Sequence, residues 1–457
     1  MIHHTATLPP ETWLLVIESL FHSLLPSVPP ITMSDSRIAR SPRAILNLCL
    51  VSRGFHQLAD KFRFQEIHVA MKESSPRKMA CIQGFLRLLE VRHEVKAWVK
   101  TFEAGIYPGI VWSRPLDYAE YTAVLPRIKS LIPELRNLRS LRCGLTVLTP
   151  YLYSNILRLE TLETLDLNLD QLDSEAVNVD HPLDRSANPP ICPLRRLDIS
   201  GEMEDKGATV SAILALIRLG TLTELKYWAR VMPETARGIT LFQAIKECIP
   251  NHIFSGLRYL EVVMPESGAN AQWFLHLGER CPNLVELRVH RNFIEHPFDF
   301  ALWLGDQVTE RHFPSLLRFA GPLALAPIFA QNRPVYSVGT SLHPFGIGPD
   351  DPTIPVNAIR SLKPSVPIRV LDLFAPRWND DDIEAVAHHH PQVEQFTYSC
   401  IEGRSLFILI SRSGFSMAAQ RRPPRVLRWA KFNPNREKAK GHAAPSHSPK
   451  GATGSTP

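Results

Sequence analysis

The sequence predicts an α/β fold with three parts: a small helical module, an irregular solenoid of parallel strands and helices, and a basic C-terminal tail. Three observations support this class. A pattern of Leu, two residues, Leu, one residue and an apolar residue recurs between residues 138 and 398. Helix-compatible stretches separate its copies, and two amphipathic segments precede them. Stacked units of strand plus helix bury one continuous core that a single unit cannot form.

The first expected helix begins near Leu8. Pro9 and Pro10 suit a first helical turn, because the amide hydrogens at that end have no partner within the helix. Glu11 then lies where the positive helix end favours a carboxylate. Apolar residues follow at spacings of three and four and predict one buried stripe: Leu14, Ile17, Phe21 and Leu24.

A second amphipathic segment covers residues 45–60, after a polar, Pro-containing stretch at 27–42. The stretch is compatible with a surface loop, because the entropy of loop closure grows slowly with length. One broad face of the second segment is apolar: Ile45, Leu46, Leu50, Val51, Phe55 and Leu58. Two short helices of this kind need another surface to bury their faces.

Together the two segments resemble an F-box over roughly residues 6–70. A Leu-Pro-x-Glu opening is followed by Leu-x-Leu-Val-Ser-Arg-x-Phe-x-x-Leu-Ala. The resemblance implies helices that pack on a Skp-family adaptor, and through it on the cullin scaffold of a ubiquitin ligase. The positions expected to contact the adaptor are Leu8, Pro9, Glu11, Ile17, Leu20, Leu46, Leu50, Val51, Ser52, Phe55 and Leu58.

Two features depart from the F-box pattern. Thr12 and Trp13 stand where many members have small or branched aliphatic residues, and the insert at 27–42 replaces a connection of a few residues. The insert motivates an alternative, in which the chain is an interaction scaffold that engages no adaptor. Residues 71–130 are expected to form a helical connector, with a helix from about Arg77 to Arg92 and an early strand around Phe102.

The repeats are expected to occupy residues 131–400. The gap between Leu316 and Ile368 predicts a degenerate unit near Val335 and Val338. The last Leu-x-apolar pair of each copy alternates like a short strand. The copies are Leu138-Leu141-Cys143, Leu162-Leu165-Leu167, Leu194-Leu197-Ile199, Leu222-Leu225-Tyr227, Leu257-Leu260-Val262, Leu284-Leu287-Val289, Leu316-Phe319, Ile368-Leu371-Leu373 and Val393-Phe396-Tyr398.

These repeats resemble leucine-rich repeats, most clearly at Glu279–Val289, where Cys-Pro-x-Leu-x-x-Leu matches a common corner of that family. The resemblance implies a parallel sheet on a concave side. The residues between the strand leucines would line it: Arg142, Asp166, Asp198, Lys226, Glu261, Arg288 and Asp372. Both signs of charge favour an unknown protein substrate over nucleic acid. For any one of these residues an ordinary solvated strand position is favoured, and only the ordered column as a group is a candidate site.

Charge is distributed unevenly. Residues 401–457 hold 11 Lys and Arg against 2 Asp and Glu, a net of +9 within a total of +6, which leaves −3 for residues 1–400. The folded part therefore lacks the basic excess of a phosphate-tracking groove. The tail is expected to be disordered, and nucleic-acid or chromatin binding through it is a further alternative.

Other patterns bear on chemistry and location. Seven cysteines without a Cys-x-x-Cys pair suit a reducing compartment, and no apolar run is long enough to span a bilayer. A cytoplasmic or nuclear protein is expected, with no membrane partner. Asp380–Asp382 and His388–His390 suggest helix ends rather than a metal site. The sequence contains no catalytic motif, so we expect no enzyme activity, cofactor or metal. The F-box resemblance implies that the chain is a substrate receptor of a ubiquitin ligase.

Overall fold

A computed structural model describes residues 61, 64–71, 76–106, 118–144, 155–168, 192–202, 216–217, 220–230, 245–246, 249–263, 268–290, 300–305, 307–340, 354–375, 379–400 and 405–409. All of them belong to one compact unit, Met1–Arg412. The predicted F-box-like helices, the insert at 27–42 and the tail beyond residue 409 lie outside the described residues.

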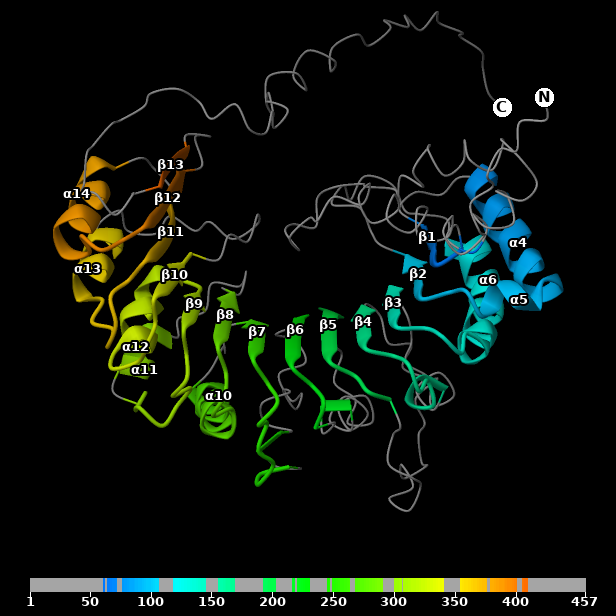
Figure 1. Cartoon of the computed structure of the whole chain (residues 1–457), viewed down its shortest axis with the longest axis horizontal. Coiled ribbons are helices and arrows are strands. Elements are labelled where there is room, and N and C mark those ends of the chain that lie inside the picture. The colour runs from blue at the N-terminus through cyan, green and yellow to red at the C-terminus, as the bar shows by residue number, and fades with distance from the viewer. Residues whose placement is uncertain are drawn as a thin grey trace, which may run out of the picture. The chain divides into compact units, whose positions relative to one another are not determined.

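The described strands form one sheet in which spatial order follows chain order. Strands β1 to β12 are parallel and β13 pairs antiparallel with β12. Their bounds are β1 Glu66–Met71, β2 Thr101–Ile106, β3 Ser140–Gly144, β4 Thr164–Asn168, β5 Arg196–Glu202, β6 Glu224–Arg230, β7 Tyr259–Val263, β8 Glu286–His290, β9 Arg318–Ala320, β10 Ser337–Gly339, β11 Val370–Ala375, β12 Gln395–Cys400 and β13 Ser405–Leu409. The architecture is a parallel α/β solenoid-like fold (Figure 1).

The described α-helices lie in connections between strands and along one side of the sheet (Figure 1). The described α-helices are α4 Pro76–Val91, α5 His93–Lys96, α6 Tyr118–Leu131, α10 Gly268–Arg280, α11 Phe300–Gly305, α12 Ala326–Ala330, α13 Ile354–Ser361 and α14 Asp380–His389, with short 3-10 helices η1 Ile132–Glu134 and η3 Leu323–Leu325. In α14, the side chain of Asn379 accepts a hydrogen bond from the backbone N–H of Asp381, which caps the helix. The predicted helix-end role of the Asp and His runs is confirmed.

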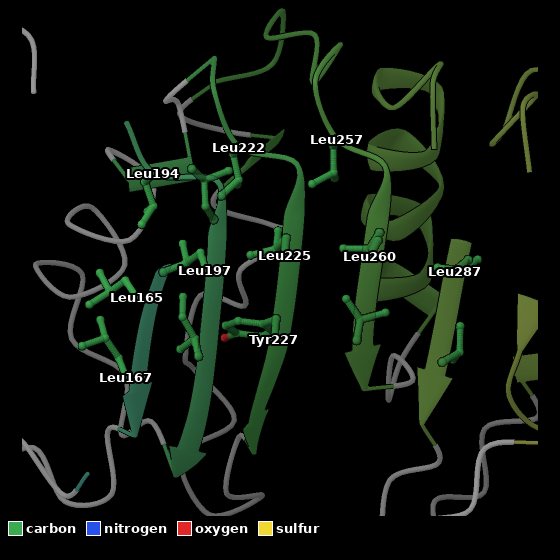
Figure 2. Close-up of a cluster of buried hydrophobic side chains, with 14 of the residues drawn as sticks. Leu165, Leu167, Leu194, Leu197, Leu222, Leu225, Tyr227, Leu257, Leu260 and Leu287 are labelled. Atoms are coloured by element: carbon green, nitrogen blue, oxygen red, sulfur yellow. The ribbon is translucent and has the colours of Figure 1, made fainter. Parts of the chain in front are cut away.

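The repeated leucines form the core on the helix side. The sheet register aligns the second leucine of successive copies across β4 to β8, and each of these side chains is at most 1% exposed. Figure 2 shows this row together with the leucines that precede the strands. Its members are Leu165, Leu197, Leu225, Leu260 and Leu287.

Backbone hydrogen bonds join each copy to the next at the corner before its strand. The carbonyl of Arg195 accepts N–H bonds from Thr223 and Glu224, at 2.8 and 2.9 Å. The same arrangement, in which two backbone N–H groups donate to one carbonyl, recurs where the following strands begin. For example, Arg258 and Tyr259 donate to the carbonyl of Thr223. Corner backbone groups are thus satisfied between repeats, which explains why the strands stay in register.

The sheet extends beyond the predicted array at both ends. β1 begins at Glu66 and β2 lies within the expected helical connector, so the sheet starts well before residue 131. At the other end, β13 lies within the expected tail. The degenerate unit predicted between residues 316 and 368 is confirmed as β10, and the early strand around Phe102 as β2.

Candidate functional site

In most strands from β1 to β12, one residue lies between two core residues, and its side chain therefore points to the face opposite the helices. The register aligns these positions into a single line across the sheet, which we call the central row. The row contains His68, Glu103, Arg142, Asp166, Asp198, Lys226, Glu261, Arg288, Ala320, Gly339, Asp372 and Thr397. All seven residues predicted for the concave face fall on it, with Ala320 and Gly339 separating the last two.

Ion pairs link the first half of the row. The Nε of Arg142 lies 2.5 Å from a carboxylate oxygen of Asp166, and its Nη1 lies 3.8 Å from Glu103. His68 Nδ1 is 2.6 Å from Glu103 on the other side. Because Arg142 is half exposed, these contacts contribute little to stability and mainly fix the positions of the charges.

Glu261 lies at the centre of the most buried polar cluster on the row. It is only 4% exposed, yet its carboxylate receives hydrogen bonds from His290 Nε2 at 2.8 Å and from the hydroxyl of Tyr259, and lies 3.2 Å from Nζ of Lys226. Burial alone would raise the pKa of Glu261, but these three partners outweigh it and lower the pKa to about 2. Glu261 is therefore a fixed negative charge.

Aromatic rings surround this cluster. The ring of Trp228 lies over that of His290 with centroids 4.1 Å apart. Tyr259 lies between two cations, with Lys226 Nζ at 5.6 Å and Arg288 Cζ at 5.4 Å from its ring centroid. Trp, Tyr and Arg are the residue types that contribute most energy at protein interfaces.

Sequence reasoning missed Trp228, Tyr259 and His290 as site residues. Each is two residues from a member of the central row on its own strand, so each points to the same face. This alternation along each strand was visible in the sequence. The contacts that these side chains make with residues of other strands were not.

Asp198 differs from the other half-buried acids of the row. Its pKa is raised to about 7, by burial first and then by the negative charge of Asp166 on β4. Lys226 and Arg196 oppose this rise without cancelling it. Among the described residues, none forms a hydrogen bond or ion pair with this carboxylate, so its charge is poorly compensated.

No family model and no curated protein matched this chain in comparisons with known proteins. The site is therefore interpreted from its own residues. In the part of the chain that the structure describes, no three His, Cys, Asp or Glu side chains form a group that could hold a metal ion. None of the described helices has the length and apolarity needed to cross a membrane. The residues predicted to contact the adaptor lie outside the described residues.

Replacing Asp198 with Asn is expected to remove a pH-dependent loss of stability. Since the folded-state pKa lies above the unfolded value, the unfolded chain releases this proton first, and the free energy of unfolding falls as pH rises from about 4 to about 7. Above that range we expect the variant to be more stable than the parent by about 1–2 kcal/mol, an amount reduced by solvent screening.

Urea unfolding at about pH 5 and about pH 8 measures this difference. Glu160→Gln is the matched control, because Glu160 is an exposed carboxylate away from the central row. The prediction would be contradicted if the free energy of unfolding changed by the same amount between these two pH values in the parent and in Asp198→Asn.

Proposed function

We propose that this chain is the substrate-recognition subunit of a cullin-type ubiquitin ligase complex. In this proposal an F-box-like N-terminus binds a Skp-family adaptor, and the sheet, as an irregular leucine-rich-repeat solenoid, binds a target protein. The observation that carries it is the central row, which follows an F-box-like segment in the same chain. The row offers charged side chains, with Trp228 and Tyr259 beside them on the same sheet face, and the described helices lie on the other side.

The proposed mechanism needs no catalytic side chain in this chain. Holding the target close to the ubiquitin-loaded enzyme raises its effective concentration, and this alone accelerates transfer. A cytoplasmic or nuclear location follows from the proposal, because the ligase machinery acts there.

The adaptor interaction tests the proposal directly. The purified full chain is expected to bind a Skp-family adaptor, and Leu8→Ala, Pro9→Ala and Val51→Ala are each expected to weaken binding by about tenfold or more, as for buried anchors at other interfaces. Val91→Ala is the matched control for Val51→Ala, because Val91 is 79% exposed on α4. Absence of adaptor binding by the parent chain would refute the ligase assignment.

The second candidate is a protein-interaction scaffold that engages no adaptor. The insert at 27–42 favours it, and the central row suits it equally well. Deleting residues 1–60 distinguishes the two, because this leaves β1, which begins at Glu66, in place. Target turnover that is lost with the deletion supports the ligase, whereas unchanged turnover with intact target binding supports the scaffold.

A further inference from the structure

The cations near the centre of the sheet already have acidic partners. Lys226 on β6 turns toward β7, where its Nζ lies 3.2 Å from Glu261 and above the ring of Tyr259. Arg288 lies 2.7 Å from Glu286 on its own strand. No cation of this set is left to attract an acidic ligand.

The same holds for the cations around Asp198. Arg142, two strands away on the row, bonds Asp166. Arg196, two residues before Asp198 on β5, lies 3.7 Å from Glu224. Together with the pairing of Lys226, this leaves Asp198 as a half-buried carboxylate whose neighbouring cations all bond other acids.

We propose that Asp198 receives a Lys or Arg side chain from the protein that this chain recruits. The proposal rests on the target-binding half of the proposed function and specifies its partner: a segment presenting a basic residue to the central row. Asp166 on the neighbouring strand adds negative charge beside the cation.

Charge complementarity decides between possible occupants. A nucleic-acid phosphate on this part of the row would face Asp166 and Asp198, and no described cation beside them is free, so the contact would be repulsive. A metal ion would find two carboxylates there, and the described residues supply no third ligand of the kind that such sites normally need. A protein cation would restore the charge balance at this position, and its planar or ammonium donors match a carboxylate.

Binding of a cation also favours the ionised carboxylate. The titratable groups that face Asp198 are Asp166 on β4, Lys226 on β6 and, more distantly, Glu261 on β7, with Arg196 on its own strand. Asp166 likewise has a pKa raised by burial, which Arg142 opposes. Affinity for a basic segment should therefore increase as pH rises through neutrality and decrease with added salt.

Selection from a displayed library of random peptides on the immobilised full chain tests the proposal. Enriched peptides are expected to share a Lys or Arg, and a synthetic copy should bind Asp198→Asn at least about tenfold more weakly than the parent. Replacing that basic residue by Gln in the peptide should have the same effect. Glu160→Gln is the control variant and should bind within about twofold of the parent.

Asp198→Glu, which keeps the charge, provides a rescue that separates electrostatics from misfolding. Adaptor binding measured on Asp198→Asn should be unchanged, so failure of the ligase assignment and failure of this proposal give different results. Enrichment of peptides without basic residues, no enrichment, binding of single-stranded DNA at the row, or equal affinity of Asp198→Asn would each overturn the proposal.

Discussion

Replacing Arg333 with Met is expected to lower the free energy of unfolding by about 2–4 kcal/mol. Arg333 is only 2% exposed and has no carboxylate bonded to it in the described structure. Its guanidinium instead donates to backbone carbonyls, including those of His312 at 2.9 Å and Thr309 at 2.5 Å. It also donates to the carbonyls of Ile328, Phe329 and Gln331 around the end of α12.

Methionine fills similar volume but donates no hydrogen bond, so these carbonyls lose their partner in a buried environment. The measurement is urea unfolding of the full chain followed by circular dichroism. Arg318→Met is the matched control, because Arg318 is 53% exposed on β9 and bonds only at the surface, with an expected cost below about 1 kcal/mol. Similar unfolding midpoints for the two variants would show that Arg333 has no structural role.

Leu225→Ala is expected to cost about 2–5 kcal/mol, as for other leucines removed from close-packed cores. Leu225 is 1% exposed and lies in the leucine row between Leu197 and Leu260 (Figure 2). Each repeat of a solenoid contacts mainly its neighbours. The cavity should therefore loosen β5 to β7 first, which hydrogen exchange of those strands would detect.

Glu224→Ala on the same strand is the control for Leu225→Ala. Its side chain points to the opposite face, where it forms a 3.7 Å ion pair with Arg196, so we expect a cost below about 1 kcal/mol. Similar losses in the free energy of unfolding for the two variants would contradict the conclusion that the leucine side of β6 forms the packed core.

Much of the fold could be predicted because each repeat encodes its own strand. The spacing of Leu197 and Ile199, with a polar residue between them, is sufficient to assign a strand and its buried face. Positions of the central row follow from the same alternation, and so Asp166, Asp198 and Lys226 were assigned to one face before their register was known.

The ends of the sheet could not be predicted in the same way. β1 lies where the F-box resemblance ends, and β13 is a continuous apolar stretch that lacks the leucine spacing. β13 also reverses direction to pair with β12, and a pattern derived from parallel repeats gives no signal for such a partner. Pairing at an edge depends on which backbone groups remain open, which only the assembled sheet defines.

By itself, then, the sequence determined the strand-and-helix repeats, the leucine core and which face carries the charges, because alternation along a strand is a local property. Only the tertiary structure decided which charges neutralise one another. It brought Lys226 to Glu261 and Arg196 to Glu224, and among the described residues it left Asp198 without an ion-pair partner, since such pairing depends on distances between strands that are far apart in sequence. The role of Arg333 was likewise invisible, because its partners are backbone carbonyls that any residue could supply.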